Sequence, residues 1–135
     1  LVFPYQDYMQ DKQNSACELV AMCRQLCPVL KVIIETGELK STALIEQVTW
    51  DVIQSGPDFI KTSTGKVKSG ASLEACAAIL RSIHKYHEQK GKLVGLKVSG
   101  GVKTITQAND YILLATEMMG KDYIHPDTFR FGASS

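Results

Sequence analysis

The sequence predicts an α/β fold in which parallel strands alternate with helices. Four apolar runs typical of strands recur along the chain, at 29–36, 58–63, 93–99 and 128–133. The stretches between them carry apolar residues at three- and four-residue spacing, as helices with one buried face do. Short links between these segments favour right-handed βαβ units and a parallel sheet. The pattern leaves two architectures open, a (β/α) barrel and an open doubly wound sheet.

The composition is that of one ordinary globular segment, 1–135. The chain has 135 residues, of which 44% are hydrophobic and 21% charged, and a net charge of +1. This balance implies no overall attraction to nucleic acid or to anionic lipid. No apolar run is long enough to cross a bilayer, and the N-terminus lacks the layout of a signal peptide. We expect a cytoplasmic protein that binds neither nucleic acid nor membranes.

Local signals mark where each element begins and ends. The opening "LVFPY" resembles the end of a strand followed by a loop that starts at proline. Capping boxes predict two helix starts, and single N-caps predict two more. Glycines predict three helix ends. The boxes are Ser15 with Glu18 and Thr104 with Gln107; the N-caps are Ser41 and Ser72; the stops are Gly56, Gly91 and Gly120.

The third of these helices carries its apolar residues on one stripe, and charged residues lie elsewhere around it. We expect the stripe to cover one face of the sheet. Its members are Leu73, Ala77, Leu80 and Ile83.

Metal and redox motifs are weak in this sequence. The four cysteines form no C-x-x-C pair and no spaced Cys/His quartet, so we expect buried, reduced thiols. His84 and His87 with Glu88 could be imagined as metal ligands, but they lie among charged residues and favour a solvated helix face. We predict no metal site.

The carboxyl ends of the four runs hold turns rich in Gly, Ser and Thr. In parallel α/β folds these ends meet at one edge, where ligands gather. Backbone N–H groups at such turns, before the next helix, bind phosphate well. Neither the P-loop motif nor G-x-G-x-x-G is present. We predict a phosphate site made by Gly65-Lys66, by Gly100-Gly101, and by Gly132 with Ser134 and Ser135.

Lysines lie within three of the strand-like runs. By the two-residue period, Lys61 and Lys97 each share a face with the serine that follows two residues later. If the two strands are neighbours, both ammonium groups point into one pocket. Two such charges about 5 Å apart repel by roughly 3 kcal/mol at an effective dielectric near 20, which favours the neutral amine that Schiff-base chemistry needs.

The alternative is that each lysine extends from a strand end to water, and Lys31 fits this better than the others. Glu35 shares a face with Lys31 and Ile33. It either joins a polar network at the strand ends or faces solvent.

Four motifs, in order and at this spacing, resemble the deoxyribose-phosphate aldolase family, whose members are class I aldolases on a TIM barrel. They are "LKVIIETGEL", "DFIKTSTGK", "GLKVSGGV" and "FRFGASS". The resemblance implies reversible cleavage of 2-deoxy-D-ribose 5-phosphate to D-glyceraldehyde 3-phosphate and acetaldehyde, without cofactor. It also implies that the chain covers the second half of a (β/α)8 barrel.

The resemblance carries residue roles onto this sequence. It implies that Lys61 forms the Schiff base and that Lys97 lowers the pKa of Lys61 and relays protons. It also implies that Thr64 lies near a substrate hydroxyl. The implied phosphate contacts are Gly65, Lys66, Gly100, Gly101, Gly132, Ser134 and Ser135.

The chain also departs from the family pattern. The family's aspartate, in the strand before a V-F-P-Y-like segment, would lie before Leu1. Three N-terminal βα units and a C-terminal helix are also expected outside these residues. A half barrel leaves a strand edge unpaired, so we expect that, taken alone, it pairs with itself, aggregates or folds poorly. The competing hypothesis is a non-catalytic, phosphate-binding α/β half barrel.

Overall fold

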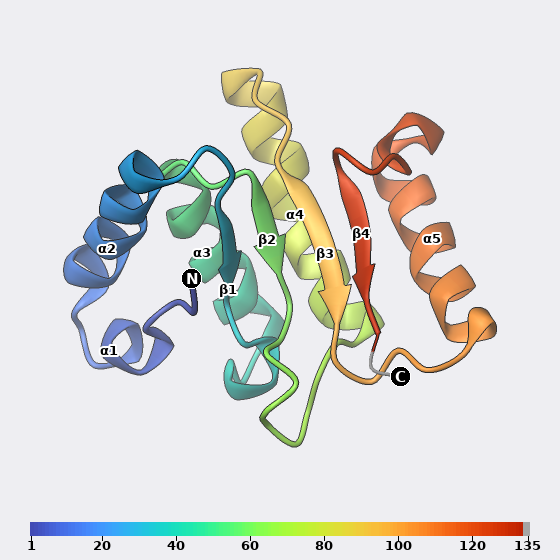
Figure 1. Ribbon diagram of the computed structural model, residues 1–135, viewed down its shortest axis with the longest axis horizontal. Helices are drawn as coiled ribbons and strands as arrows, with labels where there is room; N and C mark the ends of the chain where they lie inside the picture. The colour runs from blue at the N-terminus through green and yellow to red at the C-terminus, as the bar shows by residue number, and fades with distance from the viewer. Residues whose placement is uncertain (134–135) are drawn as a thin grey trace.

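Four parallel strands form one sheet with the order β1-β2-β3-β4 (Figure 1). The computed structural model describes residues 1–133. The strands are β1 (Lys31–Ile33), β2 (Phe59–Lys61), β3 (Gly95–Ser99) and β4 (Phe129–Gly132). Each lies inside one of the four predicted runs. The carboxyl ends therefore meet at one edge of the sheet, as the alternation of strands and helices predicts.

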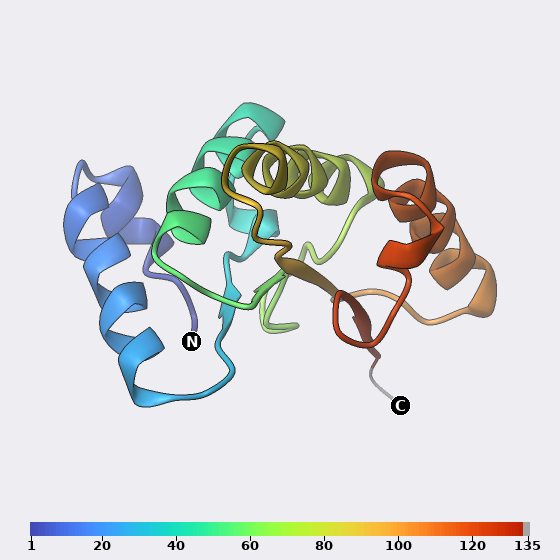
Figure 2. The same ribbon diagram turned by 90° about the horizontal axis from the view of Figure 1, so that it is seen from above.

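Helices cover one face of this sheet and leave the other open. Seen from above, they form an arc on one side of the strands (Figure 2). The α-helices are α1 (Tyr5–Met9), α2 (Gln13–Leu26), α3 (Thr42–Gln54), α4 (Leu73–Lys90) and α5 (Ile105–Met119). Two short 3-10 helices, η1 (Thr36–Glu38) and η2 (Lys121–Tyr123), lie in the connections. This arrangement confirms the predicted α/β class.

Three of the four predicted N-caps are confirmed. The hydroxyls of Ser41 and Ser72 each accept a hydrogen bond from the backbone N–H three residues on, at 3.1 Å. Thr104 and Gln107 form the reciprocal capping box that begins α5. Gly91 ends α4 with φ +75, in the left-handed region that glycine adopts without strain.

The predicted start of α2 is wrong. This helix begins at Gln13 with Lys12 as N-cap, so Ser15 and Glu18 lie within it and form no capping box. The backbone bond from the Ala16 N–H to the Lys12 carbonyl already closes the first turn. The segment after Pro4 is also more ordered than predicted, because it contains α1.

The core lies between the sheet and the helices. Val32, Ile60 and Leu96 occupy matched positions on three strands, point toward the helices and are fully buried. The buried face of α4, on the other side of the core, is rotated relative to the predicted stripe. Leu73 is exposed and Ala77 is only partly buried, while the buried face of α4 centres on Cys76, Ile79, Leu80 and Ile83.

One partly exposed ion pair fixes the start of β2. Asp58 accepts hydrogen bonds from the Leu30 N–H and from the Arg24 guanidinium on α2. Burial alone would raise the pKa of Asp58, but these two donors together lower it. The pair therefore ties α2 to the sheet while the carboxylate is charged.

The N-terminal residues extend the sheet beyond β1. Val2 pairs with Ile33 in a parallel bridge, and the Phe3 N–H donates to the Ile33 carbonyl at 2.8 Å. This agrees with the prediction that "LVFPY" begins as the end of a strand. The sheet thus curves from residues 1–3 to β4, as half of a barrel would.

Candidate active site

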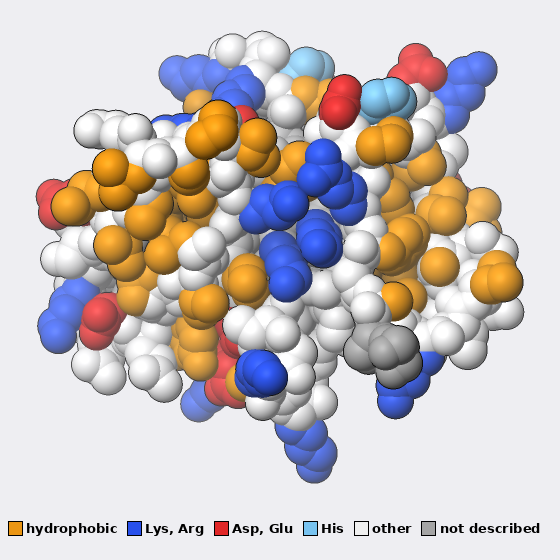
Figure 3. Space-filling model, in the orientation of Figure 1, with side chains coloured by type: hydrophobic (Ala, Val, Ile, Leu, Met, Phe, Trp, Pro, Cys, Tyr) orange, Lys and Arg blue, Asp and Glu red, His pale blue; other side chains and the backbone are white. Residues whose placement is uncertain are grey.

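Four basic side chains share the open face of the sheet, and we call them the basic cluster. Lys61 on β2 lies directly beside Lys97 on β3, and Lys97 beside Arg130 on β4. Lys31 on β1 is the register partner of Phe59, which lies two residues before Lys61 on β2. Figure 3 shows Lys and Arg side chains gathered over the middle of this face, between two apolar areas. This register makes Lys61 and Lys97 neighbours, as predicted.

A cavity of about 340 Å³ opens beside Lys61 at the carboxyl ends of the strands. Its walls come from the three turns that the sequence singles out, together with Thr64 and Ser99. Lys97 does not line it, but the Lys97 Nζ lies 3.9 Å from the point where a Cβ on Gly132 would stand. The lining residues among the predicted set are Lys61, Thr64, Gly65, Lys66, Gly100, Gly101 and Gly132. Ser134 and Ser135 lie outside the described residues.

The surroundings of Lys61 favour its neutral form. Burial lowers the pKa of this amine most, the Lys97 ammonium lowers it further, and Lys31 adds a smaller effect in the same direction. The Glu35 carboxylate acts the other way and raises it. The net pKa lies below the usual 10.5, which is the direction that a nucleophilic amine requires.

The glycines of these turns adopt left-handed backbone angles, but the turn after β2 does not lead directly into a helix. Gly65, Gly100 and Gly101 have φ of +82, +91 and +89. After Gly65, however, the chain continues as a loop until α4 begins at Leu73. The predicted helix-dipole contribution to anion binding is therefore wrong at Gly65, since the dipole acts only within the first turn of a helix.

Lys66 is placed differently from the prediction. Its backbone N–H donates to the Thr64 Oγ1 at 3.0 Å, so this group already has a partner. The Lys66 side chain is exposed at the rim, and its ammonium remains as the group that can reach a phosphate.

Hydroxyl groups join the carboxyl ends of β2 and β3 beneath the cavity. The Thr62 hydroxyl donates to the Ser99 carbonyl at 2.7 Å and accepts from the Ser99 N–H at 2.9 Å. The Ser99 hydroxyl donates to the Ser63 carbonyl at 2.8 Å. These bonds hold the two turns at a fixed separation. Sequence reasoning missed them, although Ser and Thr at strand ends are the residues that can make them.

Glu35 belongs to a polar network and does not face solvent. It is 3% exposed and accepts hydrogen bonds from both the backbone N–H and the hydroxyl of Thr64. The network alternative for this residue is the one that the structure supports.

Arg130 has a role that sequence reasoning missed. Its guanidinium stacks over the Phe59 ring at 4.5 Å, and the Lys31 Nζ lies 5.8 Å from the same ring. Gly95 on β3, the register partner of Phe59, has no side chain, and a Cβ there would lie 2.4 Å from the Phe59 ring. The glycine therefore leaves room for the aromatic ring that supports two cations of the basic cluster.

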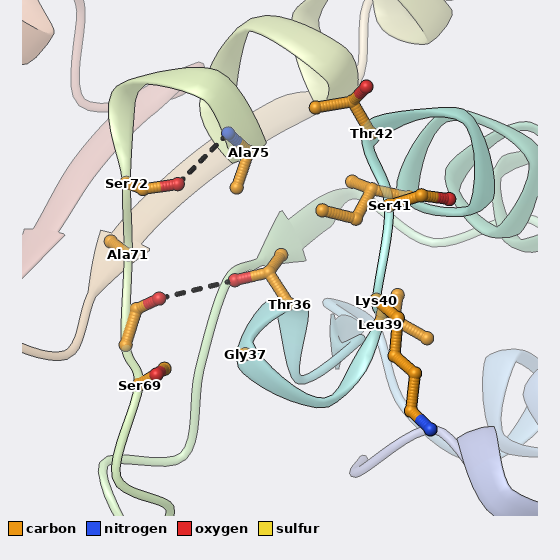
Figure 4. Close-up of a pocket in the computed structure, with 12 residues that line it drawn as sticks. Thr36, Gly37, Leu39, Lys40, Ser41, Thr42, Ser69, Ala71, Ser72 and Ala75 are labelled. Carbon is orange, nitrogen blue, oxygen red and sulfur yellow. Dashed lines mark hydrogen bonds between the residues drawn. The ribbon is translucent and has the colours of Figure 1, made fainter.

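A larger cavity of about 480 Å³ lies elsewhere, between the loop after β1 and the segment before α4. Figure 4 shows its walls, where the Thr36 hydroxyl donates to the Gly70 carbonyl and Ser72 caps α4. Hydroxyl side chains and apolar side chains, among them Leu39 and Ile45, line it with a single lysine, Lys40. It contains no residue of the basic cluster, and the Lys61 cavity is therefore the better candidate.

Other groups considered from sequence stay apart from the site. His84 contacts Glu88 at 3.3 Å on the exposed side of α4. Within residues 1–133, no three His, Cys, Asp or Glu side chains are grouped so as to hold a metal ion. Of the cysteines, only Cys76 is buried, and the other three are partly exposed. No helix in the described part of the chain has the length and apolar content to span a membrane.

The fold and the site define a (β/α)-barrel segment with a lysine pair at the ends of adjacent strands. A family model described as DeoC/LacD family aldolase matches residues 1–120. The chain is 45% identical to deoxyribose-phosphate aldolase from Agrobacterium fabrum, over 99% of this chain and 51% of that protein. The chain belongs to the DeoC/LacD aldolase family, as the motifs implied. It spans about half the length of this curated relative.

Solved structures show the same fold. A Toxoplasma gondii protein assigned as a deoxyribose-phosphate aldolase superposes with a TM-score of 0.87 at 21% identity, over 97% of this chain and 53% of that one. A further structure, described as an aldolase, matches with a TM-score of 0.74 at 26% identity, over 96% of this chain and 52% of that one. Both support a half barrel.

Proposed function

We propose that this chain carries the Schiff-base half of a class I aldolase that reversibly cleaves 2-deoxy-D-ribose 5-phosphate to D-glyceraldehyde 3-phosphate and acetaldehyde. One observation carries the proposal. Lys61 lies beside Lys97 in register, and Lys61 lines a cavity whose other walls are glycine turns. The lowered pKa of Lys61 supports the same assignment.

In the cleavage direction, Lys61 acts as the nucleophile. Its neutral amine adds to the C1 aldehyde carbon, and loss of water gives an imine. In its protonated form, the imine accepts the electron pair of the C2–C3 bond when the C3 hydroxyl loses its proton, which releases glyceraldehyde 3-phosphate and leaves an enamine. Protonation of the enamine carbon and hydrolysis then release acetaldehyde and restore the amine. Lys97 keeps the Lys61 amine available and moves protons in this sequence.

The phosphate of the substrate would lie among the turns. Gly65, Gly100, Gly101 and Gly132 let the backbone approach it closely, because each lacks a side chain at the cavity wall. The Lys66 ammonium supplies a charge at the rim. Thr64 lies at the same wall, where it can contact a substrate hydroxyl. No cofactor is needed, because the imine itself accepts the electrons.

Borohydride trapping on the full-length protein tests the proposal. The protein is incubated with acetaldehyde and reduced, and the modified peptide is mapped by mass spectrometry. We expect one adduct at Lys61, its loss in Lys61→Met, and its persistence in Lys90→Met, which removes an exposed lysine at the end of α4. A folded protein that forms no adduct would refute the aldolase assignment and leave the non-catalytic, phosphate-binding alternative.

A further inference from the structure

Glu35 combines burial with an unusual backbone. It follows β1 with φ 54 and ψ 64, in the left-handed region where a residue with a Cβ is strained. Backbone bonds hold the chain on either side of it to the end of β2. The Ile34 N–H donates to the Lys61 carbonyl at 3.1 Å, and the Thr36 N–H donates to the Thr62 carbonyl at 2.8 Å. The fold therefore maintains this conformation at the edge of the Lys61 cavity.

The Glu35 side chain is committed to one residue of the next loop. One carboxylate oxygen accepts from the Thr64 N–H at 3.1 Å, and the other accepts from the Thr64 hydroxyl at 2.6 Å. The Thr64 hydroxyl in turn accepts from the Lys66 N–H at 3.0 Å. A continuous chain of hydrogen bonds therefore runs from the end of β1 through Thr64 to the Gly65-Lys66 turn.

A carboxylate suits this position better than an amide would. Both groups of Thr64 donate to Glu35, and a carboxylate accepts at both oxygens, whereas an amide that donated its NH2 group to the Thr64 oxygen would leave the Thr64 O–H without an acceptor. Burying the charge is costly unless hydrogen bonds and a nearby cation compensate it. Thr64 supplies two such hydrogen bonds.

We propose that Glu35 is a positioning residue that fixes the Thr64–Lys66 turn in its phosphate-binding shape. This inference rests on the proposed function only in assigning the phosphate to that turn. Glu35 does not line the Lys61 cavity, and its side chain reaches the turn through Thr64. Its removal should therefore weaken the binding of phosphorylated ligands without slowing imine formation with acetaldehyde, because acetaldehyde carries no phosphate.

The sign of the effect separates positioning from charge. A buried carboxylate that acted only through its charge would repel a phosphate, so that Glu35→Gln would bind phosphate more tightly. Positioning predicts weaker binding, because a neutral amide makes weaker hydrogen bonds to Thr64 than a carboxylate does, and an NH2 group turned toward the Thr64 oxygen leaves the Thr64 O–H without its acceptor. Thr64→Val breaks the same chain of bonds without changing any charge, and it should act in the same direction.

The test is a calorimetric titration of the full-length protein with inorganic phosphate as the probe. We expect Glu35→Gln and Thr64→Val to raise the phosphate Kd about tenfold. Glu38→Gln, an exposed change three residues on, should stay within about twofold of wild type. The Glu35→Gln/Thr64→Val double variant should bind no more weakly than the poorer single variant, because both act on one link.

Kinetics provide a second readout. In Glu35→Gln, the KM for 2-deoxyribose 5-phosphate should rise about tenfold while kcat changes less than threefold, and borohydride should still trap acetaldehyde on Lys61. Unchanged or tighter phosphate binding in Glu35→Gln and Thr64→Val would overturn the inference. A wild-type protein that forms no acetaldehyde adduct would instead refute the proposed function, and the phosphate titrations would still decide the role of Glu35.

Discussion

The contribution of Lys97 to the reactivity of Lys61 can be measured by replacing Lys97 with methionine. The two residues are direct partners in the register of β2 and β3, and neighbouring strands lie about 4.8 Å apart. Two unit charges at about 5 Å repel by roughly 3 kcal/mol at an effective dielectric near 20. Both side chains are partly exposed, so solvent screening reduces this repulsion.

We expect Lys97→Met to slow acetaldehyde trapping at pH 7 by about tenfold, which corresponds to about 1.4 kcal/mol. The sign follows from the pKa of Lys61, which the neighbouring ammonium lowers after burial has done so. Without Lys97 that pKa rises, and less neutral amine is present at pH 7. At pH values above 10.5, the usual pKa of lysine, both proteins are deprotonated at Lys61 and their rates should converge.

Two further variants provide internal controls in the same assay. Lys31→Met should slow trapping less than Lys97→Met, because the effect of Lys31 on the pKa of Lys61 is the smaller of the two. Glu35→Gln should speed trapping at pH 7, because the Glu35 carboxylate raises that pKa. An equal loss in Lys97→Met at every pH would refute the electrostatic argument and assign Lys97 to proton transfer alone.

Three other predictions concern stability. Gly70→Ala would place a Cβ 2.3 Å from the Gly100 carbonyl oxygen, so the free energy of unfolding should fall by about 1–3 kcal/mol in urea titrations; an unchanged midpoint would show that these backbones can separate. Asp58, paired with Arg24, has a lowered pKa, so its contribution is present above pH 3.8 and is lost as the pH falls further. The urea midpoints of wild type and Asp58→Asn should therefore differ at pH 7 and converge near pH 2, and a constant difference would contradict the linkage. Thr104→Ala should cost about 1 kcal/mol in thermal unfolding, unlike Thr104→Ser, which keeps the cap.

Much of the fold could be predicted because its signals are local. The N-caps Ser41, Ser72 and Thr104 make their bonds within three residues, so sequence spacing alone locates them. The start of α2 was missed because Ser15 and Glu18 match a capping box that the chain does not use. There, backbone bonding from Lys12 starts the helix three residues earlier than its side chains suggest.

The site was partly predictable for a different reason. The two-residue period of a strand places Lys61 and Lys97 on one face, but only the register of β2 and β3 makes them neighbours. Arg130 was missed because its position depends on β4 pairing with β3 and on the space that Gly95 leaves above Phe59. Neither fact is local in sequence.

The sequence by itself determined the alternation of strands and helices, the glycine turns at the carboxyl ends of the strands, and the family motifs. These depend on backbone propensities and short-range spacing, which act within a few residues. Only the tertiary structure decided that Glu35 is buried against Thr64, that the Lys66 N–H already has a partner, and that Gly65 lies outside any helix start. The contact of Glu35 with Thr64 joins segments about thirty residues apart, and strand pairing in the sheet brings them together. The other two facts depend on the path of the loop between β2 and α4, which sequence spacing does not define.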